Sequence, residues 1–149
     1  MAETIADYNF KTPIPIRFSD IDAYGNVSNT IYFTFFEIAR LAYWRDAIKW
    51  DFNKAGVILG RSEINYLKTL TIDDKINCYV RTSRIGTSSF DVMYLLTRET
   101  AEGSEEICTT GKSVCISYDY GAKESIPIPT EERESMIHYD EPGLITNTN

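Results

Sequence analysis

Residues 17–40 (RFSDIDAYGNVSNTIYFTFFEIAR) contain the side chains best suited to chemistry, two carboxylates two positions apart in a polar turn. Asp20 and Asp22 are followed by Gly25 and then by a long apolar stretch with helical spacing. A carboxylate can act as a general base or as a nucleophile. The first turn of a helix offers unpaired N–H groups and a partial positive charge, which stabilise a developing oxyanion. Together these features are the parts needed to open an activated ester.

The turn with the two carboxylates lies between a predicted strand and a predicted helix. Residues 12–18 alternate in hydropathy, and their two prolines are typical of an edge strand or a strand start. From residue 29 to about residue 50, apolar side chains recur at helical spacing, starting at Ile31 and again at Tyr32. These side chains cover more than half of the helix circumference, so we expect other elements to enclose the helix.

The pattern changes to the period of strands in the rest of the chain. Long strands are predicted at 57–69, 75–85, 88–100 and 106–119. Short polar connections separate consecutive strands, which predicts an antiparallel meander. Thr130 is predicted to cap a short helix over residues 131–136. The first eight or so residues and the tail from Tyr139 onwards are predicted to be loosely ordered.

One long apolar helix and about five long antiparallel strands leave few arrangements, and they predict the α+β class. The sheet must curl around the helix to cover its apolar surface. We expect a single domain over residues 1–149, with its core at about residues 12–136. The outer face and the edges of such a sheet stay partly apolar, so self-association is expected.

The composition narrows the partners of the protein. A net charge of −7 disfavours nucleic acid and acidic membranes, because both bind basic surfaces. No apolar run approaches the roughly 20 residues of a membrane span. The N-terminal residues lack the basic and apolar regions of a secretion signal. Cys78, Cys108 and Cys115 have no metal-ligand spacing, so reduced core cysteines in a cytoplasmic protein are expected.

The single histidine excludes one common class of hydrolase. His138 lies beyond the predicted core, and the chain contains no G-x-S-x-G motif. A Ser-His-Asp enzyme needs a histidine beside its nucleophile. The carboxylates of the 17–40 segment are therefore better candidates for the catalytic groups. From spacing alone, Asp22 can equally be a turn former and Asp20 a structural partner of Arg17.

Three segments together resemble a known family. DIDAYGNVSNTIYFTFFEIAR, EINYLKTLTIDDKI and RIGTSSF are similar to the hotdog-fold acyl-CoA thioesterases, in the branch that includes 4-hydroxybenzoyl-CoA thioesterase. The resemblance covers roughly residues 12–136. It implies a hotdog fold, in which an antiparallel sheet of about five strands wraps around one central helix. The self-association expected from the sheet is predicted to give a homodimer, which can pair into a dimer of dimers, and both states stay open.

The resemblance gives roles to residues of the first segment. Asp22 matches the family's catalytic carboxylate, which acts as nucleophile or as general base on water. A backbone N–H near Asn29 would hold the thioester carbonyl at the helix start, and Tyr32 would line the acyl pocket. Glu37 matches a recurrent helix glutamate, for which a structural role is expected. Asn26 stands where many relatives have a histidine, so a proton shuttle at that position is lost.

Basic and hydroxyl side chains further along the chain are candidates for binding coenzyme A. Lys68, Arg81 and Arg84 are predicted to hold its phosphates, since a guanidinium matches a phosphate with two parallel hydrogen bonds. Ser88 and Ser89 are predicted to lie beside the pantetheine. Strand arginines are commonly just solvated, and that reading stays open for each of them.

The predicted activity is hydrolysis of an acyl-CoA thioester to a free acid and coenzyme A. A thioester already has a good leaving group, so neither a metal nor a redox cofactor is expected. Two alternatives stay open: hydrolysis of acyl groups carried on a carrier protein, and acyl-CoA binding without catalysis. The aromatic side chains near the helix suit aryl or medium-length acyl groups, but core packing explains them equally well.

Overall fold

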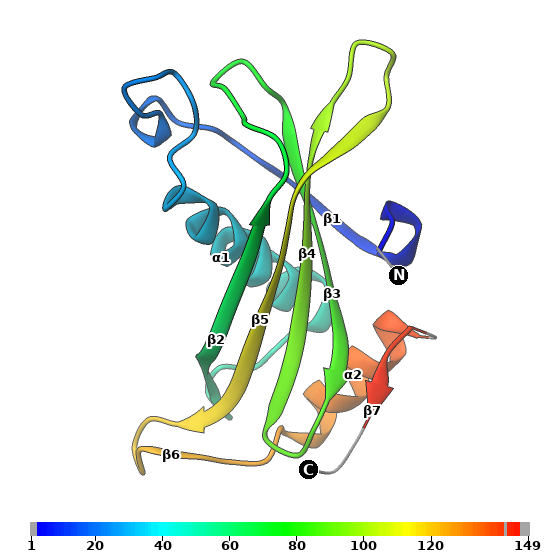
Figure 1. The fold of residues 1–149 in the computed structure, drawn as a ribbon. Helices are drawn as coiled ribbons and strands as arrows, with labels where there is room; N and C mark the ends of the chain where they lie inside the picture. Colours follow the sequence, from blue (N-terminus) through cyan, green and yellow to red (C-terminus); the bar gives the residue numbers. More distant parts are fainter. Residues whose placement is uncertain (1–2, 142, 147–149) are drawn as a thin grey trace.

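A curled antiparallel sheet packs against a long helix (Figure 1). The computed structural model describes residues 3–141 and 143–146. Its strands are β1 (Phe10–Ile14), β2 (Gly56–Tyr66), β3 (Ile76–Ile85), β4 (Ser89–Glu99), β5 (Glu105–Asp119), β6 (Glu124–Ser125) and β7 (Ile145–Thr146). Its helices are η1 (Ile5–Asp7), η2 (Phe18–Asp20), α1 (Ile31–Tyr43), η3 (Trp44–Ile48) and α2 (Thr130–Asp140).

The strand order is β1–β3–β4–β5–β2, with β6 paired to β5 and β7 paired to β3. The strands β3, β4 and β5 form the predicted meander, but β2 pairs with β5 and not with β3, which follows it in the chain. The expectation of one continuous meander is therefore wrong for β2. Residues 67–75 connect β2 to β3 and pair with the turn before α1, where the Val27 N–H donates to the Leu70 carbonyl at 2.8 Å. The same crossover thus builds one wall of the helix start.

The predicted long helix is confirmed, with a change of type near its end. Regular α1 covers Ile31–Tyr43 and continues as a π-helical turn, η3, over Trp44–Ile48. The helix ends at Lys49, whose backbone is left-handed with φ 63°. The Trp50 N–H then donates to the Trp44 carbonyl at 2.9 Å, which closes the helix end.

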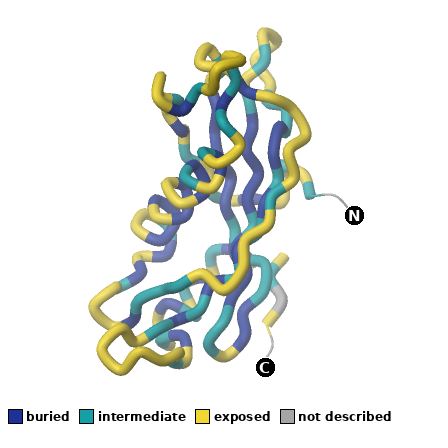
Figure 2. The backbone as a smooth tube through the Cα atoms, turned by 60° about the vertical axis from the view of Figure 1, so that its left-hand side comes forward, coloured by how far each residue is buried: buried dark blue, intermediate teal, exposed yellow. Residues whose placement is uncertain are grey.

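The apolar surface of α1 is only partly covered within one chain. Tyr32, Phe35 and other inward-facing side chains are buried against the sheet. Phe33, Ile38 and Leu41, by contrast, are 42%, 41% and 46% exposed. Figure 2 shows this pattern as alternating buried and exposed turns along the helix. The expectation that other elements enclose the helix is therefore wrong for the single chain, because the sheet covers one side of it.

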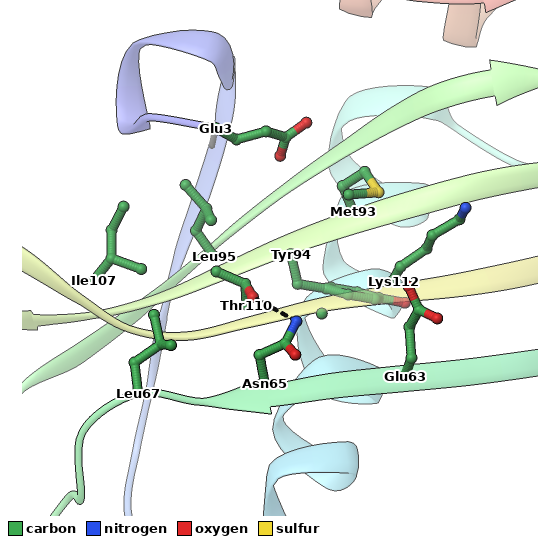
Figure 3. Close-up of a pocket in the computed structure, with 11 residues that line it drawn as sticks. Glu3, Glu63, Asn65, Leu67, Met93, Tyr94, Leu95, Ile107, Thr110 and Lys112 are labelled. Atoms are coloured by element: carbon green, nitrogen blue, oxygen red, sulfur yellow. Dashed lines mark hydrogen bonds between the residues drawn. The ribbon is translucent and has the colours of Figure 1, made fainter. Parts of the chain in front are cut away.

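The outer face of the sheet, away from α1, carries a second small core. Tyr8, Tyr79 and Leu95 are buried there, and Ile5 packs against them. The segment before β1, predicted to be loose, instead forms the short 3-10 turn η1. A cavity of about 350 Å³ opens beside this core, with α1 on the other side of the strands (Figure 3). It contains no residue of the polar turn 20–28, so it is distinct from the predicted site.

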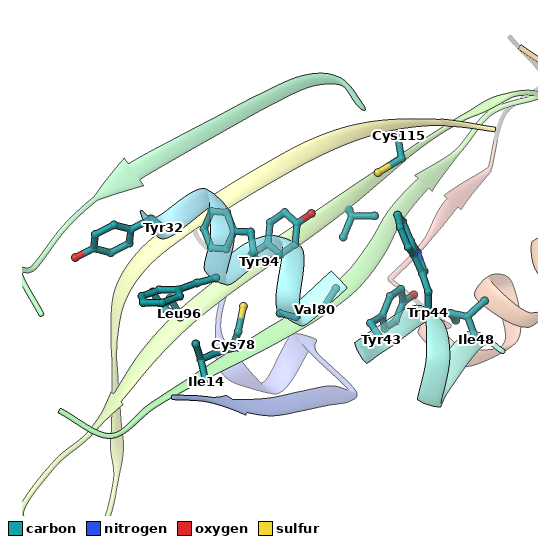
Figure 4. Close-up of a cluster of buried hydrophobic side chains, with 14 of the residues drawn as sticks. Ile14, Tyr32, Tyr43, Trp44, Ile48, Cys78, Val80, Tyr94, Leu96 and Cys115 are labelled. Carbon is teal, nitrogen blue, oxygen red and sulfur yellow. The ribbon is translucent and has the colours of Figure 1, made fainter. Parts of the chain in front are cut away.

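The main core lies between α1 and the inner face of the sheet (Figure 4). The Phe36 ring stacks on the Tyr94 ring of β4, with centroids 4.3 Å apart and planes 9° apart. Gly111 of β5 permits this approach, since a Cβ atom there would overlap the Phe36 ring. Aromatic pairs of this kind contribute beyond the area they bury. The contact fixes the middle of α1 on the sheet and so fixes where the helix begins.

The C-terminal helix is longer than predicted. Helix α2 spans Thr130–Asp140, and Pro129 occupies the N-cap position that was predicted for Thr130. Tyr139, expected in a loose tail, is helical, and its hydroxyl donates to the Asn9 carbonyl at 3.0 Å. The buried Asp140 carboxylate accepts hydrogen bonds from the Tyr43 hydroxyl and the Thr82 N–H. These contacts explain the extra helical turns. Residues 142 and 147–149 of the predicted tail lie outside the described residues.

Candidate active site

Asp22 is held by the turn in which it lies. Its Oδ1 accepts hydrogen bonds from the N–H groups of Tyr24 at 2.9 Å and Asn26 at 3.1 Å. Gly25 has φ 84°, a left-handed conformation that glycine adopts without strain. The second carboxylate oxygen, Oδ2, makes no hydrogen bond to any residue in 3–141 or 143–146. One oxygen therefore fixes the orientation of the carboxylate while the other stays available.

Asp20 stabilises the turn through its contacts with Arg17, in the structural role that was expected. Its carboxylate is buried and binds the Arg17 guanidinium at 2.9 Å and the Arg17 N–H at 2.8 Å. Burial raises the pKa of Asp20, but the hydrogen bonds and charge of Arg17 outweigh it and hold the pKa below its usual value. The Asp20 carbonyl also accepts from the Ser28 N–H at 2.9 Å. This network ties both ends of the turn together.

The start of α1 leaves backbone donors free. The Ile31 N–H donates to the Ser28 carbonyl at 3.0 Å, and Thr30 makes no side-chain cap. Within the described part of the chain, the N–H groups of Asn29 and Thr30 have no hydrogen-bond acceptor. Both residues are exposed. Free N–H groups at a helix start form a site for a negative charge.

A cavity of about 180 Å³ joins these groups. It is lined by Asp22, Asn26, Val27, Asn29, Tyr32, Tyr66, Leu67, Lys68 and Thr69. The structure therefore brings four of the predicted site residues, Asp22, Asn29, Tyr32 and Lys68, to one place. Burial raises the pKa of the Tyr32 hydroxyl to about 12, so this hydroxyl stays protonated at neutral pH. The cavity offers a carboxylate, free amides and aromatic walls side by side.

Tyr66 is a cavity residue that the sequence did not reveal. Its hydroxyl donates to the Asn29 carbonyl at 2.8 Å, and its ring meets the Tyr32 ring edge-on with centroids 5.0 Å apart. The hydrogen bond ties the end of β2 to Asn29, two residues before α1. In the sequence Tyr66 is one aromatic residue at the end of a predicted strand, and its role depends on the β2 crossover.

Lys68 is the cavity's cation. Its ammonium binds Glu106 at 2.7 Å, and its side chain is 51% exposed. Arg98 also binds Glu106, so two cations share one carboxylate at the rim. An exposed pair of this kind is weak.

The other predicted coenzyme A residues lie elsewhere. Arg81 binds Glu3, and Arg84 binds Asp91 at 3.0 Å and the Ser89 hydroxyl at 3.0 Å. Ser88 precedes β4, at the hairpin that Figure 1 shows at the opposite end of the sheet from the turn before α1. Within one chain these residues do not join the Asp22 cavity. Contact between them and coenzyme A stays a prediction.

Glu37 and Asn26 also have defined places. Glu37 lies outside the Asp22 cavity, is 62% exposed, and approaches Arg40 at 3.7 Å. Asn26 lines the cavity, and its N–H supports the Asp22 carboxylate at 3.1 Å. The backbone at position 26 therefore orients the carboxylate, whichever side chain stands there.

The cysteines and the acidic side chains form no metal site in the part of the chain that the structure describes. Cys78, Cys108 and Cys115 are free and buried, in agreement with the expected core cysteines. No group of three or more His, Cys, Asp or Glu side chains in the described chain could hold a metal ion. No helix within the described ranges is long and apolar enough to cross a membrane.

Comparison with known proteins agrees with this geometry. A family model described as the thioesterase-like superfamily matches residues 16–136. The uncharacterized protein YsmA of Bacillus subtilis (strain 168) is 28% identical over 132 residues, which cover 88% of this chain and 87% of YsmA.

Comparison with solved structures also finds thioesterases with the same fold. A thioesterase from Thermus thermophilus, complexed with coenzyme A and Zn, has a TM-score of 0.78 at 26% identity, covering 91% of this chain and 97% of that chain. The 4-hydroxybenzoyl-CoA thioesterase of Pseudomonas sp. strain CBS-3 shares the fold, with a TM-score of 0.71 at 18% identity over 85% of this chain and 97% of that chain. These findings confirm the predicted α+β hotdog fold, and they support the predicted class of thioester hydrolase. The chain belongs to the thioesterase-like superfamily.

Proposed function

We propose that the protein is an acyl-CoA thioesterase whose catalytic carboxylate is Asp22. One observation carries the proposal: the carboxylate of Asp22, with Oδ2 free, shares a cavity with Asn29, whose N–H has no acceptor among the described residues. A base or nucleophile and an oxyanion donor are the two groups that thioester hydrolysis needs.

The carbonyl oxygen of the thioester would lie on the free N–H near Asn29. There the positive end of the α1 dipole and the N–H stabilise the charge that develops in the transition state. One such donor typically contributes about 2.7–4 kcal/mol, or roughly 10²–10³ in rate. Tyr66 holds the Asn29 carbonyl at 2.8 Å and so keeps this segment in place during the reaction.

Asp22 can act by either of two balanced routes. As a nucleophile, it bonds to the carbonyl carbon while the C–S bond breaks, and coenzyme A leaves as a thiolate that takes a proton from water; a second water then hydrolyses the anhydride. As a general base, it takes a proton from the water whose oxygen bonds to the carbonyl carbon; the C–S bond then breaks, and the leaving thiolate takes up the proton from Asp22. Both routes yield one acid and one thiol. Neither needs a metal or a redox cofactor, because the thiolate is already a good leaving group.

Coenzyme A is the carrier that the site favours. The Thermus relative was solved with coenzyme A, and Lys68 at the cavity rim can bind a phosphate. An acidic carrier protein would be repelled by a chain with a net charge of −7. The free, buried cysteines agree with a cytoplasmic enzyme.

We propose further that the active form is a homodimer, which can pair into a dimer of dimers. The apolar side chains of Phe33, Ile38 and Leu41 stay exposed on α1 in the single chain, and a second subunit would cover them. Binding of the acyl-CoA at the subunit interface would also allow Arg81, Arg84, Ser88 and Ser89 to reach the coenzyme from the other chain. Sedimentation velocity measures this state directly.

A thiol-release screen tests the proposed function. Purified protein is incubated with short, medium, long and aryl acyl-CoAs and with the matching carrier-protein thioesters. Release of free coenzyme A is expected, with much slower release from the carrier. Binding of acyl-CoA without release of thiol would instead identify a non-catalytic acyl-binding protein, the alternative that Asn26 in place of histidine favours.

A further inference from the structure

A second cavity, separate from the Asp22 cavity, lies beside α1. It has a volume of about 180 Å³ and lies between α1 and the strands β2 and β5. Its main lining residues are Phe33, Phe36, Arg40, Leu59, Ser62 and Ser113.

Residues of α1 and β2 line both cavities, although the two linings have no residue in common. Tyr32 lines the first and the next residue, Phe33, lines the second. On the facing strand β2, the lining passes from Tyr66 in the first cavity to Ser62 in the second. The same helix and the same strand therefore form both walls, so the second cavity is where an acyl chain would extend.

Arg40 is a buried cation with few partners. Its side chain is 8% exposed, and one Nη donates to the Tyr94 hydroxyl at 3.1 Å. Its guanidinium carbon lies 5.7 Å from the centroid of the Trp44 ring, a cation–π contact that offsets part of the cost of burial. Its Nε is buried and has no hydrogen-bond partner among the described residues. Its carboxylate neighbour is Glu37, whose oxygen is 3.7 Å away, beyond hydrogen-bond distance, on a side chain that is 62% exposed. A guanidinium has five N–H donors, so most of them are left for another group.

This arrangement is costly unless something else pairs with Arg40. An arginine cannot lose its proton, and a buried charge is stable only when it is paired and hydrogen-bonded. Asp91, a carboxylate on the inner strand β4, is already bound by Arg84 at 3.0 Å and by Lys112 at 3.4 Å. No carboxylate of the described chain thus forms a hydrogen bond with Arg40.

Hydroxyl groups gather beside the Arg40 side chain. The Tyr94 hydroxyl donates to the Ser113 hydroxyl at 3.0 Å, and the Ser113 hydroxyl lies 3.4 Å from the Ser62 hydroxyl. Phe33, Phe36 and Leu59 add apolar surface to the lining, and Thr34 and the Glu37 carboxylate complete it. The cavity therefore suits a ligand that is mostly hydrocarbon and carries a negative group at its end.

The distance between the carbonyl site near Asn29 and the Arg40 guanidinium agrees with a medium-length acyl chain. Arg40 lies about 13 Å along the axis from Ile31 at the helix start, at 1.5 Å per residue. Helix side chains lean toward the N-terminus, which brings the guanidinium closer to the carbonyl site by a few ångströms. An acyl chain bound by its carbonyl near Asn29 would thus place its far end near Arg40.

We propose that Arg40 selects acyl-CoA substrates whose acyl group ends in a carboxylate. This rests on the proposed thioesterase function. The terminal carboxylate replaces Glu37 as the partner of Arg40 and accepts from the free guanidinium donors, while Ser62 and Ser113 bind its second oxygen. Glu37 turns away from the guanidinium, which costs little because its contact with Arg40 is long and exposed in the single chain.

The test compares two substrates of equal length, suberoyl-CoA with a terminal carboxylate and octanoyl-CoA with a terminal methyl. The wild-type kcat/KM for suberoyl-CoA is expected to exceed that for octanoyl-CoA by at least about tenfold, because octanoyl leaves the buried guanidinium unpaired. An equal or higher kcat/KM for octanoyl-CoA would overturn the proposal without any variant. If neither ester is hydrolysed, the proposed function fails, and calorimetric Kd values for the same two esters decide on the subsite by the same tenfold margin.

Three variants test whether Arg40 produces the preference for suberoyl-CoA. Arg40→Met keeps the alkyl chain and is expected to abolish the preference, mainly through a higher KM for suberoyl-CoA. Glu37→Gln removes the competing carboxylate and is expected to increase the preference about threefold. Arg61→Met is the matched control, because Arg61 is 73% exposed and pairs with Glu63 at 3.2 Å, outside the cavity.

A structural role of Arg40 gives a different result. If Arg40→Met lowers kcat/KM equally for both esters, or if it converts the oligomer to monomers, then Arg40 serves packing or the interface and the proposal is wrong. If Arg40→Met does not fold, Glu37→Gln and the wild-type ratio decide: an unchanged ratio in Glu37→Gln, together with no wild-type preference, contradicts the proposal.

Discussion

Replacement of Asp22 by asparagine separates the chemical role of its carboxylate from its structural role. In Asp22→Asn the remaining Oδ1 still accepts from the N–H groups of Tyr24 and Asn26, so the turn keeps its geometry. The free Oδ2 becomes an NH2 group, which can neither attack a carbonyl nor accept a proton. The variant therefore removes one function from the site and leaves the fold in place.

The expected loss follows from the chemistry of that single oxygen. A positioned base contributes roughly 10²–10⁴ in rate, so kcat should fall by at least two orders of magnitude, or about 2.7 kcal/mol or more. KM should change by less than about threefold, because substrate binding does not depend on proton transfer. Release of coenzyme A, followed with a chromogenic disulfide over a range of acyl-CoA concentrations up to saturation, measures both constants.

Asp119→Asn is a well-matched control. The Asp119 Oδ1 also accepts two backbone hydrogen bonds, from Gly121 at 2.9 Å and from Ala122 at 3.1 Å, in the turn after β5. It lies outside the Asp22 cavity, so its kcat should stay within about twofold of the wild type. Near-normal turnover by a folded Asp22→Asn protein would refute the assignment, and Glu37→Gln would then be the next variant to assay for a loss of kcat.

Three further predictions concern neighbouring features. Tyr66→Phe removes the hydrogen bond to the Asn29 carbonyl, and kcat should fall about tenfold while the melting temperature changes by a few degrees. Burial raises the pKa of Glu105, but hydrogen bonds from Tyr79, Thr97 and Lys11 outweigh it and lower the pKa to about 2. The ionised Glu105 therefore stabilises the folded state fully above about pH 4.3, and this stabilisation is lost as the pH falls through 2. The wild type should therefore exceed Glu105→Gln in urea midpoint at pH 6 and approach it near pH 2, and a pH-independent difference would contradict this. Burial raises the pKa of the Cys115 thiol to about 12, so native protein should not react with a disulfide reagent at pH 8 until it is unfolded.

Most of the helices and strands could be predicted from hydrophobic periodicity. The helix from Ile31 and the four long strands appear within a few residues of their predicted ends, although no residue of β2 is fully buried in the single chain. The pairing of β2 with β5 was not readable, since a crossover depends on contacts between segments that are distant in sequence. For the same reason the exposed side of α1 and the extra turns of α2, which Asp140 and Tyr139 anchor, were missed.

The residues of the candidate site fall into the same two groups, those that could be predicted from the sequence and those whose roles depend on distant contacts. Asp22 and Asn29 flank one turn, so they lie close in sequence, and the family resemblance had assigned both to the site. Lys68 reaches the same cavity through the β2 crossover, and it was predicted as a cation that could bind a phosphate. Tyr66 and Arg40 gave no signal, because an aromatic residue in a strand and a cation in a helix are common and their roles come from what faces them.

The absence of a side chain at Gly111 controls how much space remains in the second cavity, beside Arg40. The Phe36 ring rests directly on this glycine, and the same ring lines the second cavity beside Arg40. A methyl group at position 111 would push the ring off the sheet and into that cavity, shortening the room for a bound hydrocarbon chain. A single exchange on β5, far in sequence from every group that takes part in chemistry, would thereby convert the protein to one that accepts shorter acyl groups.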